Sequence, residues 1–269
     1  MGSLIRFSGV VILAVAMGTA GCSTVPGTGR QRLDLMPDAQ MNQLGREGFD
    51  QILSEQQVVI HGADVQRVQR IGRDVITSAR SLYPSASIPD EWEIVLIEDD
   101  TPNAFAVPGG RIGVHTGMLR VAENDDAVAA VLGHEVGHVL AEHSGERMSQ
   151  VLLLGIGLAV GDAATRDEDE DTRRNVMLAM GIGSQVGIML PYSRLHESEA
   201  DELGLMISAN AGYDPRESIG LWQRMNEEGG GRLEFLSTHP NPATRIASLR
   251  ALMPQARRLY LRAQARQSR

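Results

Sequence analysis

Apolar residues recur at helical spacing over much of the chain. Across residues 63–82 an apolar side chain returns to the same helical face every three or four positions, which predicts an amphipathic helix. A second helix is expected over residues 36–56. A longer one is expected from residue 124 to about residue 150, with acids in its first turn, where the helix dipole favours them. Helices therefore dominate the predicted fold.

Extended segments are fewer and lie together in the first half of the chain. Residues 92–97 are apolar and β-branched and end at an acidic run, which is typical of a strand. Residues 103–107 meet the turn Pro108-Gly109-Gly110 and return as residues 111–115, which predicts a hairpin. The predicted fold class is α+β: a mostly helical domain with a small sheet bordering a cleft.

Two apolar, glycine-rich arms, residues 151–160 and 176–190, flank the acidic run 167–171. Each arm is shorter than the roughly 20 residues that a membrane span needs, so a transmembrane hairpin is disfavoured. The favoured interpretation is a helical hairpin buried in the core. The alternative is a mobile cover over a cleft, because glycine lowers local stability.

The N-terminus follows a signal-peptide pattern. Arg6 precedes an apolar run over residues 7–17, and small residues 18–21 precede Cys22, as at a cleavage site. Cys22 is the single cysteine, which excludes a disulfide within the chain. The residues before it resemble a bacterial lipobox, and we expect Cys22 to be lipidated. The expected organisation is a signal peptide (1–21), a flexible tether (22–35), one folded domain (36–254) and a solvated basic tail (255–269).

Charge and the residues beside Cys22 limit the expected partners. The 25 basic residues face 34 acidic ones, a net charge of −9, so we expect no nucleic-acid partner, which would need a basic face. A lipid anchor at Cys22 makes a membrane the expected partner. Ser23 after the cysteine resembles the outer-membrane sorting class. The expected location is therefore the bacterial periplasm, anchored to the outer membrane.

The pentapeptide His134-Glu135-Val136-Gly137-His138 carries the strongest chemical signal. Side chains four apart share a helical face, so His134 and His138 can both bind one metal ion. Glu135 is turned about 100° from His134 and can hold a water molecule and take its proton. The alternative is two packing histidines, but burying these polar groups without partners costs several kcal/mol. The pattern predicts one zinc ion per chain.

A zinc site of this kind needs a third protein ligand. The metzincin pattern is absent, because Ala141 and Ser144 occupy its glycine and histidine positions. His143 is one residue out of register, so we expect the helix to continue through it. Glu197 and Asp201 lie four apart, which suits a carboxylate ligand and an acid that orients a ligating histidine through its other nitrogen.

Small residues on both predicted helices support a close approach. Gly133 and Gly137 lie on the first helix, and Ala200 and Gly204 flank the face of Glu197 on the second. The remaining polar residues nearby are expected to have lesser roles. Glu199 is expected to face solvent, and four other histidines are expected to be structural or surface groups: His61, His115, His143 and His196.

The combination of HEVGH with a later Glu-x-x-Ala-Asp resembles metallopeptidase family forty-eight of the gluzincins. The segment Asn103-Ala104-Phe105-Ala106 before the turn 108–110 is similar to the family's strand preceding the metal helix. His239-Pro240 with Arg245 is similar to its C-terminal element. The similarity covers roughly residues 36–252, and the layout is nearest to that of the LoiP-like periplasmic lipoproteins.

The resemblance implies a role for each matching residue. Glu197 would be the third zinc ligand. His239 would either steady the transition state or close onto the metal and silence it. Arg245 would brace His239 or grip a substrate carbonyl, and a structural salt bridge is the alternative. Asn103, Ala104, Phe105 and Ala106 would form the edge strand along which an extended peptide adds.

The resulting hypothesis is a zinc endopeptidase that hydrolyses unfolded or misassembled cell-envelope proteins and that works beside the envelope assembly machinery. Two other classes of protein stay open. One is a zinc-containing envelope chaperone or assembly factor with little proteolytic activity. The other is a lipid-anchored binding module whose HEVGH pentapeptide arose by chance.

Overall fold

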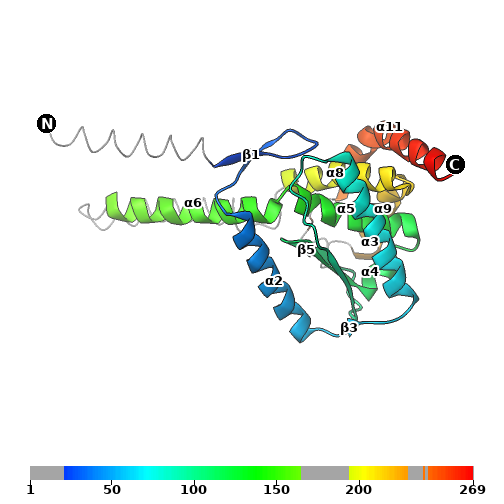
Figure 1. Ribbon diagram of the computed structural model, residues 1–269, viewed down its shortest axis with the longest axis horizontal. Helices are drawn as coiled ribbons and strands as arrows, with labels where there is room; N and C mark the ends of the chain where they lie inside the picture. The colour runs from blue at the N-terminus through cyan, green and yellow to red at the C-terminus, as the bar shows by residue number, and fades with distance from the viewer. Residues whose placement is uncertain (1–20, 165–193, 230–238, 240–241, 269) are drawn as a thin grey trace.

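The computed structural model describes residues 21–164, 194–229, 239 and 242–268 (Figure 1). The predicted signal peptide and the second apolar arm, 176–190, lie outside the described residues. The described chain is mostly helical with two small sheets, which confirms the α+β prediction. Its helices are α2 (Asp38–Glu55), α3 (Ala63–Leu82), α4 (Thr116–Val121), α5 (Asp125–Leu140), α6 (His143–Ala164), α8 (Arg194–Ala211), α9 (Glu217–Gly229) and α11 (Pro242–Gln267).

The larger sheet has the strand order β3-β4-β6-β5. Its strands are β3 (Val58–Val59), β4 (Glu93–Ile97), β5 (Ala104–Val107) and β6 (Arg111–His115). β4 and β6 are parallel, whereas β5 and β6 form the predicted antiparallel hairpin, with Phe105 opposite Gly113. β5 is an edge strand of this sheet and packs against α5.

The core lies between this sheet and the helices α3, α5 and α8, with α9 and α11 completing it. The apolar face of α3 is buried as its periodicity predicted. α5 contributes a nearly continuous buried surface, from Ala127 to Leu140. In Figure 1, α5 lies at the centre of the molecule, between α3 and α8. The helix that carries HEVGH is therefore held on several sides.

The helix predicted to run from 124 to 150 is interrupted. α5 ends at Leu140, and α6 begins at His143. Between them Glu142 has φ 52°, a left-handed conformation that costs a non-glycine residue energy and ends a right-handed helix. The expectation that the helix continues through His143 was wrong, and the break changes the direction of the chain just after His138.

The segment 22–35, expected to be a flexible tether, contains an antiparallel hairpin of β1 (Cys22–Thr24) and β2 (Gln31–Leu33). Val25 is fully buried, and the Arg32 guanidinium donates to the carbonyl oxygen of Ala141 at 3.0 Å. The expectation failed because these contacts join residues that are distant in sequence. The basic tail also differs, since α11 continues to Gln267 and buries Ala256 and Ala263.

α6 extends away from the helical body (Figure 1). Four apolar side chains on its described part are 42% to 51% exposed: Val151, Leu152, Leu153 and Ile156. The favoured interpretation, an arm buried in the core, is wrong for these residues, because a large part of each side chain remains exposed. Within the described part of the chain, no helix has both the length and the apolar character required to cross a bilayer.

Candidate metal centre

α5 and α8 approach closely because glycines remove side chains from their contact. A Cβ atom added to Gly204 would lie 2.7 Å from the backbone nitrogen of His134, and one added to Gly137 would lie 2.8 Å from the carbonyl oxygen of Ala200. Real side chains do not reach such distances. The predicted close approach is confirmed, and it brings Glu197 to the two histidines of α5.

Four buried side chains converge at this contact: His134, His138, Glu197 and His239. The Nε2 atoms of His134 and His138 are 3.0 Å apart, and Nδ1 of His239 lies 3.2 Å from Nε2 of His134. Glu197 Oε1 lies 3.5 Å from Nε2 of His138 and 3.0 Å from Nδ1 of His239. Ligands held about 2.0–2.1 Å from a tetrahedral zinc ion are about 3.3 Å from one another. The donor atoms and their spacing therefore fit a four-coordinate metal ion.

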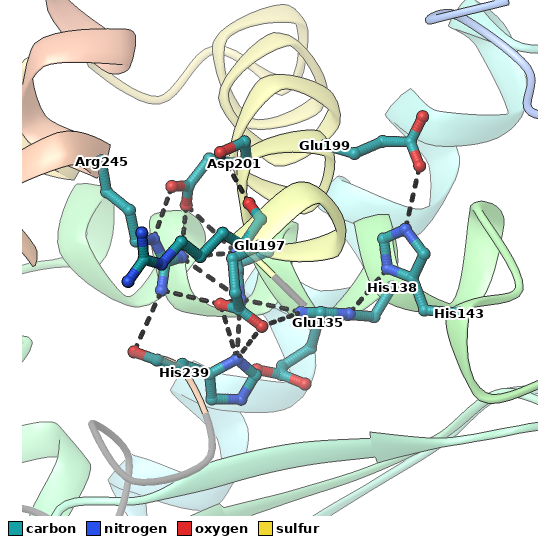
Figure 2. A network of polar contacts seen from close by, with 11 residues as sticks. Glu135, His138, His143, Glu197, Glu199, Asp201, His239 and Arg245 are labelled. Atoms are coloured by element: carbon teal, nitrogen blue, oxygen red, sulfur yellow. Dashed lines mark hydrogen bonds and ion pairs between the residues drawn. The ribbon is translucent and has the colours of Figure 1, made fainter. Parts of the chain in front are cut away.

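The far side of His134 is fixed by acids and an arginine. Its Nδ1 lies 3.2 Å from Oδ1 of Asp201, which is the orienting contact predicted for that acid. The guanidinium of Arg245 contacts Asp201 at 2.5 Å and Glu197 at 2.8 Å. Figure 2 shows this arginine reaching across both carboxylates. At 2% exposed and 3.6 Å from the Trp222 ring centroid, Arg245 is placed as a structural salt bridge.

Glu135 lies beside the four-residue cluster. It is 1% exposed, and within the described structure its Oε1 atom has no hydrogen-bond partner. Its nearest basic neighbour is Nε2 of His239, at 3.7 Å. Burial raises the pKa of Glu135 to about 7, and the negative charge of Glu197 acts in the same direction. A carboxylate with such a pKa can both take and release a proton near neutrality.

The predicted substrate strand borders the site. The backbone of Ala106 lies near the carboxylate of Glu135 and acts to lower its pKa, against the effect of burial. Asn103 accepts a backbone hydrogen bond from His115 at 2.9 Å, and Ala104 is fully buried. Phe105 packs edge-on against Phe49, with 6.1 Å between ring centroids. Most of the predicted segment is therefore fixed in the sheet.

A cavity of about 270 Å³ opens beside the metal cluster. Its wall includes Ala106, Val107 and Pro108 from the β5 side and His138 from α5. α2 contributes Met41 to the same wall. The cavity therefore connects the exposed end of the edge strand with the metal-binding residues, as a peptide-binding cleft requires.

The structure buries three polar residues on the far side of His138, and one of them, Glu199, was wrongly expected to face solvent. His143 is fully buried, and its Nδ1 lies 2.8 Å from Nδ1 of His138. Glu199, expected to face solvent, is 5% exposed and lies 3.0 Å from Nε2 of His143. His196 is also buried and stacks on His143 at 4.4 Å between ring centroids. The N-terminal hairpin covers this face of α8, and no local pattern indicated that cover.

The HEVGH helix, the acidic helix α8 and the edge strand together form the kind of site that metallopeptidases use. The chain belongs to Peptidase family M48, whose model matches residues 63–253. Membership of this metal-dependent family excludes a chance HEVGH pentapeptide.

Relatives support this assignment. The chain is 37% identical over 182 residues to the mitochondrial metalloendopeptidase OMA1 of Saccharomyces cerevisiae, a match that covers 63% of this chain and 49% of the relative. It is 29% identical over 243 residues to the human OMA1, covering 86% and 46%. It is 24% identical over 241 residues to the beta-barrel assembly-enhancing protease of Escherichia coli, covering 87% and 48%. The chain thus spans about half the length of these curated relatives.

The expected bacterial periplasmic, outer-membrane location is contradicted. Relatives at 35% to 37% identity from yeasts, a plant and cattle are mitochondrial metalloendopeptidases. The expectation rested on Cys22 and its neighbours alone, and the chemistry of the metal cluster is the same in either compartment. Cys22 is exposed on β1, and its lipidation stays a prediction.

Proposed function

We propose that this chain is a zinc-dependent endopeptidase that cleaves extended segments of unfolded or misassembled proteins. The observation that carries the proposal is the convergence of His134, His138 and Glu197 within metal-binding distance of one another, beside a buried glutamate and an edge strand. Imidazole and carboxylate donors suit zinc. One ion per chain accounts for the cluster.

His134, His138 and Glu197 would hold the zinc ion. A bound zinc ion lowers the pKa of water toward about 7 and polarises a carbonyl oxygen. Glu135 accepts the proton of the attacking water and passes it to the leaving amine, a role typically worth about 10²–10⁴ in rate. Its burial and its place beside the cluster suit this transfer. Asp201 keeps the His134 ring oriented through Nδ1.

The substrate class follows from β5. An extended peptide can add to an edge strand by backbone hydrogen bonds, which recognise main chain and tolerate varied sequences. Only unfolded or misassembled chains offer such a segment. The Escherichia coli relative is named as a protease that enhances β-barrel assembly. This supports two finer parts of the proposal: misassembled cell-envelope proteins as substrates, and contact with an assembly machinery.

The test is cleavage of unfolded casein by the full chain, with zinc, with a chelator, and with the Glu135→Gln variant. We expect Glu135→Gln to lower the cleavage rate about 10²–10⁴-fold while zinc content stays at one ion per chain. Chelator should abolish cleavage by the unmodified chain. Intact casein in every arm would instead favour the alternative, a zinc-containing assembly factor.

His239 occupies the fourth position of the cluster, with Nδ1 3.0 Å from both oxygens of Glu197. This placement supports the closing role over the transition-state role, because a catalytic zinc site keeps its fourth position for water. We propose that this arrangement is a resting state, from which His239 must withdraw before a substrate is cleaved.

The His239→Ala variant tests this resting state. We expect casein cleavage to become faster and zinc exchange, followed with a coloured chelator, to accelerate. Loss of cleavage with unchanged zinc exchange would assign His239 to the transition state instead. Glu135→Gln in the same background should remain inactive.

A further inference from the structure

The ring of His138 has a second nitrogen that faces away from the metal cluster. Nε2 faces the cluster, 3.0 Å from Nε2 of His134. Nδ1 instead lies 2.8 Å from Nδ1 of His143, whose Nε2 lies 3.0 Å from Oε2 of Glu199. Figure 2 shows the line of contacts from Glu199 through His143 to His138. On the Nδ1 side, His134 meets the carboxylate of Asp201 directly, whereas His138 reaches the carboxylate of Glu199 through the imidazole of His143.

The order of donors along this line follows from the carboxylate. An ionised carboxylate accepts hydrogen bonds and donates none, so Nε2 of His143 carries the proton that it shares with Glu199. In the neutral ring, Nδ1 of His143 is then an acceptor, and Nδ1 of His138 must donate to it. That leaves the lone pair of His138 on Nε2, where it faces the cluster.

We infer that His143 and Glu199 are positioning residues that hold His138 in its metal-binding tautomer. The inference rests on the proposed function in one respect: these residues affect catalysis only if His138 binds a catalytic zinc ion. It does not depend on which peptide is cleaved. Contacts of this kind typically contribute 10–100-fold to metal affinity.

The helix break at Glu142 makes the contact possible. On a continuous helix, five residues turn the chain about 140° beyond a full turn, so a residue at position 143 would point away from His138. The left-handed φ of 52° at Glu142 ends α5 and starts α6 at His143. The new direction returns the ring of His143 to the far nitrogen of His138.

The N-terminal hairpin holds the outer end of the line. Nε of Arg30 donates to Oε2 of Glu199 at 2.8 Å, and Thr28 donates to Oε1 of the same carboxylate. The remaining nitrogens of Arg30 donate to Glu146 at 2.7 and 2.9 Å. Glu146 also meets Nε2 of His196 at 3.0 Å. A segment next to Cys22 in sequence is thereby coupled to a metal ligand.

The decisive measurement is zinc affinity of the full chain, obtained by competition with a coloured chelator. We expect His143→Leu to weaken zinc binding 10–100-fold. The matched control is His115→Leu, which replaces another buried histidine, 6% exposed and bonded to the Thr101 carbonyl oxygen. It should leave zinc affinity within about twofold. Equal affinity in His143→Leu and the unmodified chain would overturn the inference.

Two variants of Glu199 test whether an acceptor oxygen at this position is enough to preserve zinc affinity. Glu199→Gln keeps an acceptor oxygen for His143 and should retain zinc affinity within a few-fold, whereas Glu199→Leu should lose 10-fold or more. Equal affinities for the two variants would contradict the relay. These results concern metal binding, so they remain informative even if casein is not cleaved. Failure of the proposed function can therefore be distinguished from failure of this inference.

A measurement on the unmodified chain covers the case in which the variants fail to fold. Nitrogen NMR of the zinc-loaded protein with labelled histidine reports which ring nitrogen carries hydrogen. We expect His138 to be protonated at Nδ1 and His143 at Nε2. A proton on Nδ1 of His143 would reverse the donor order and overturn the inference.

Discussion

The two histidines of α5 that we propose as metal ligands are supported in different ways. His134 contacts the carboxylate of Asp201 directly, and that acid is paired with Arg245, whose side chain is 2% exposed. On the side away from the metal cluster, His138 reaches the carboxylate of Glu199 through His143, and the outer cation, Arg30, is 17% exposed at its side chain. The first support lies inside the helical body. The second depends on a hairpin laid over it.

The two kinds of support should affect different properties, folding stability on the His134 side and metal affinity on the His138 side. A buried ion pair that loses one partner leaves a charge away from water, which is strongly destabilising. A partly exposed pair loses less, because water can reach the remaining charge. The His134 side should therefore decide whether the domain folds, whereas the His138 side should set how tightly the folded domain holds its metal.

The largest effect is expected from Asp201→Ala. Arg245 would keep Glu197 but lose its two-point contact with Asp201, 2.6 Å from Nε and 2.5 Å from Nη2. We expect the free energy of unfolding to fall by about 3–5 kcal/mol, measured by urea unfolding of the metal-free chain. Asp100→Ala is the control, since Asp100 is 96% exposed in its pair with Arg120, and its effect should stay within about 0.5 kcal/mol. A loss below 1 kcal/mol for Asp201→Ala would remove the proposed contrast.

A smaller effect is expected from Arg30→Ala. The change leaves the carboxylates of Glu146 and Glu199 without the cation between them. We expect a loss of about 1–3 kcal/mol in urea unfolding, the range for hydrogen bonds to charged groups. Arg30→Lys keeps the charge but cannot pair at two points, so its loss should be intermediate. A loss equal to or larger than that of Asp201→Ala would contradict the expected ranking of the two sides.

The smallest effect is expected for folding stability at acidic pH. Burial opposes ionisation of Glu146, but hydrogen bonds from His196 and Arg30 lower its pKa from 4.5 to about 2. A lowered folded-state pKa stabilises the fold above pH 4.5, and this contribution disappears as the pH falls toward 2. We expect the urea midpoint to drop between pH 5 and pH 3, and to drop less in Arg30→Ala. Identical slopes in both proteins would show that this pair does not cause the pH dependence.

The sequence was sufficient for the parts of the site that follow helical spacing. His134 and His138, and likewise Glu197 and Asp201, lie four residues apart, and in both pairs the shared helical face holds in the structure. The close approach of α5 and α8 was predicted from the small residues that lie beside the candidate ligands on both helices. The β5–β6 hairpin followed from its Pro-Gly-Gly turn. Periodicity and turn chemistry are local, so they can be interpreted without the fold.

The contacts on the His138 side could not be predicted, because they depend on tertiary structure and not on local spacing. Glu142 adopts a positive φ although it is not a glycine, so no residue type marked the helix break. Glu199 is on the helix face opposite Glu197, which predicts exposure, but Arg30 and Thr28 cover it from 169 and 171 residues away. Tertiary contacts over such distances leave no trace in local spacing.

The sequence distance between Arg30 and its partners also has a consequence for the order of events during synthesis. Arg30 leaves the ribosome early, whereas Glu146 and Glu199 follow 116 and 169 residues later. Contacts between such distant residues form slowly, because the intervening chain must first be closed into a loop. Glu197, a candidate metal ligand on α8, is also made late, so the four-residue cluster cannot form before α8 has been synthesised.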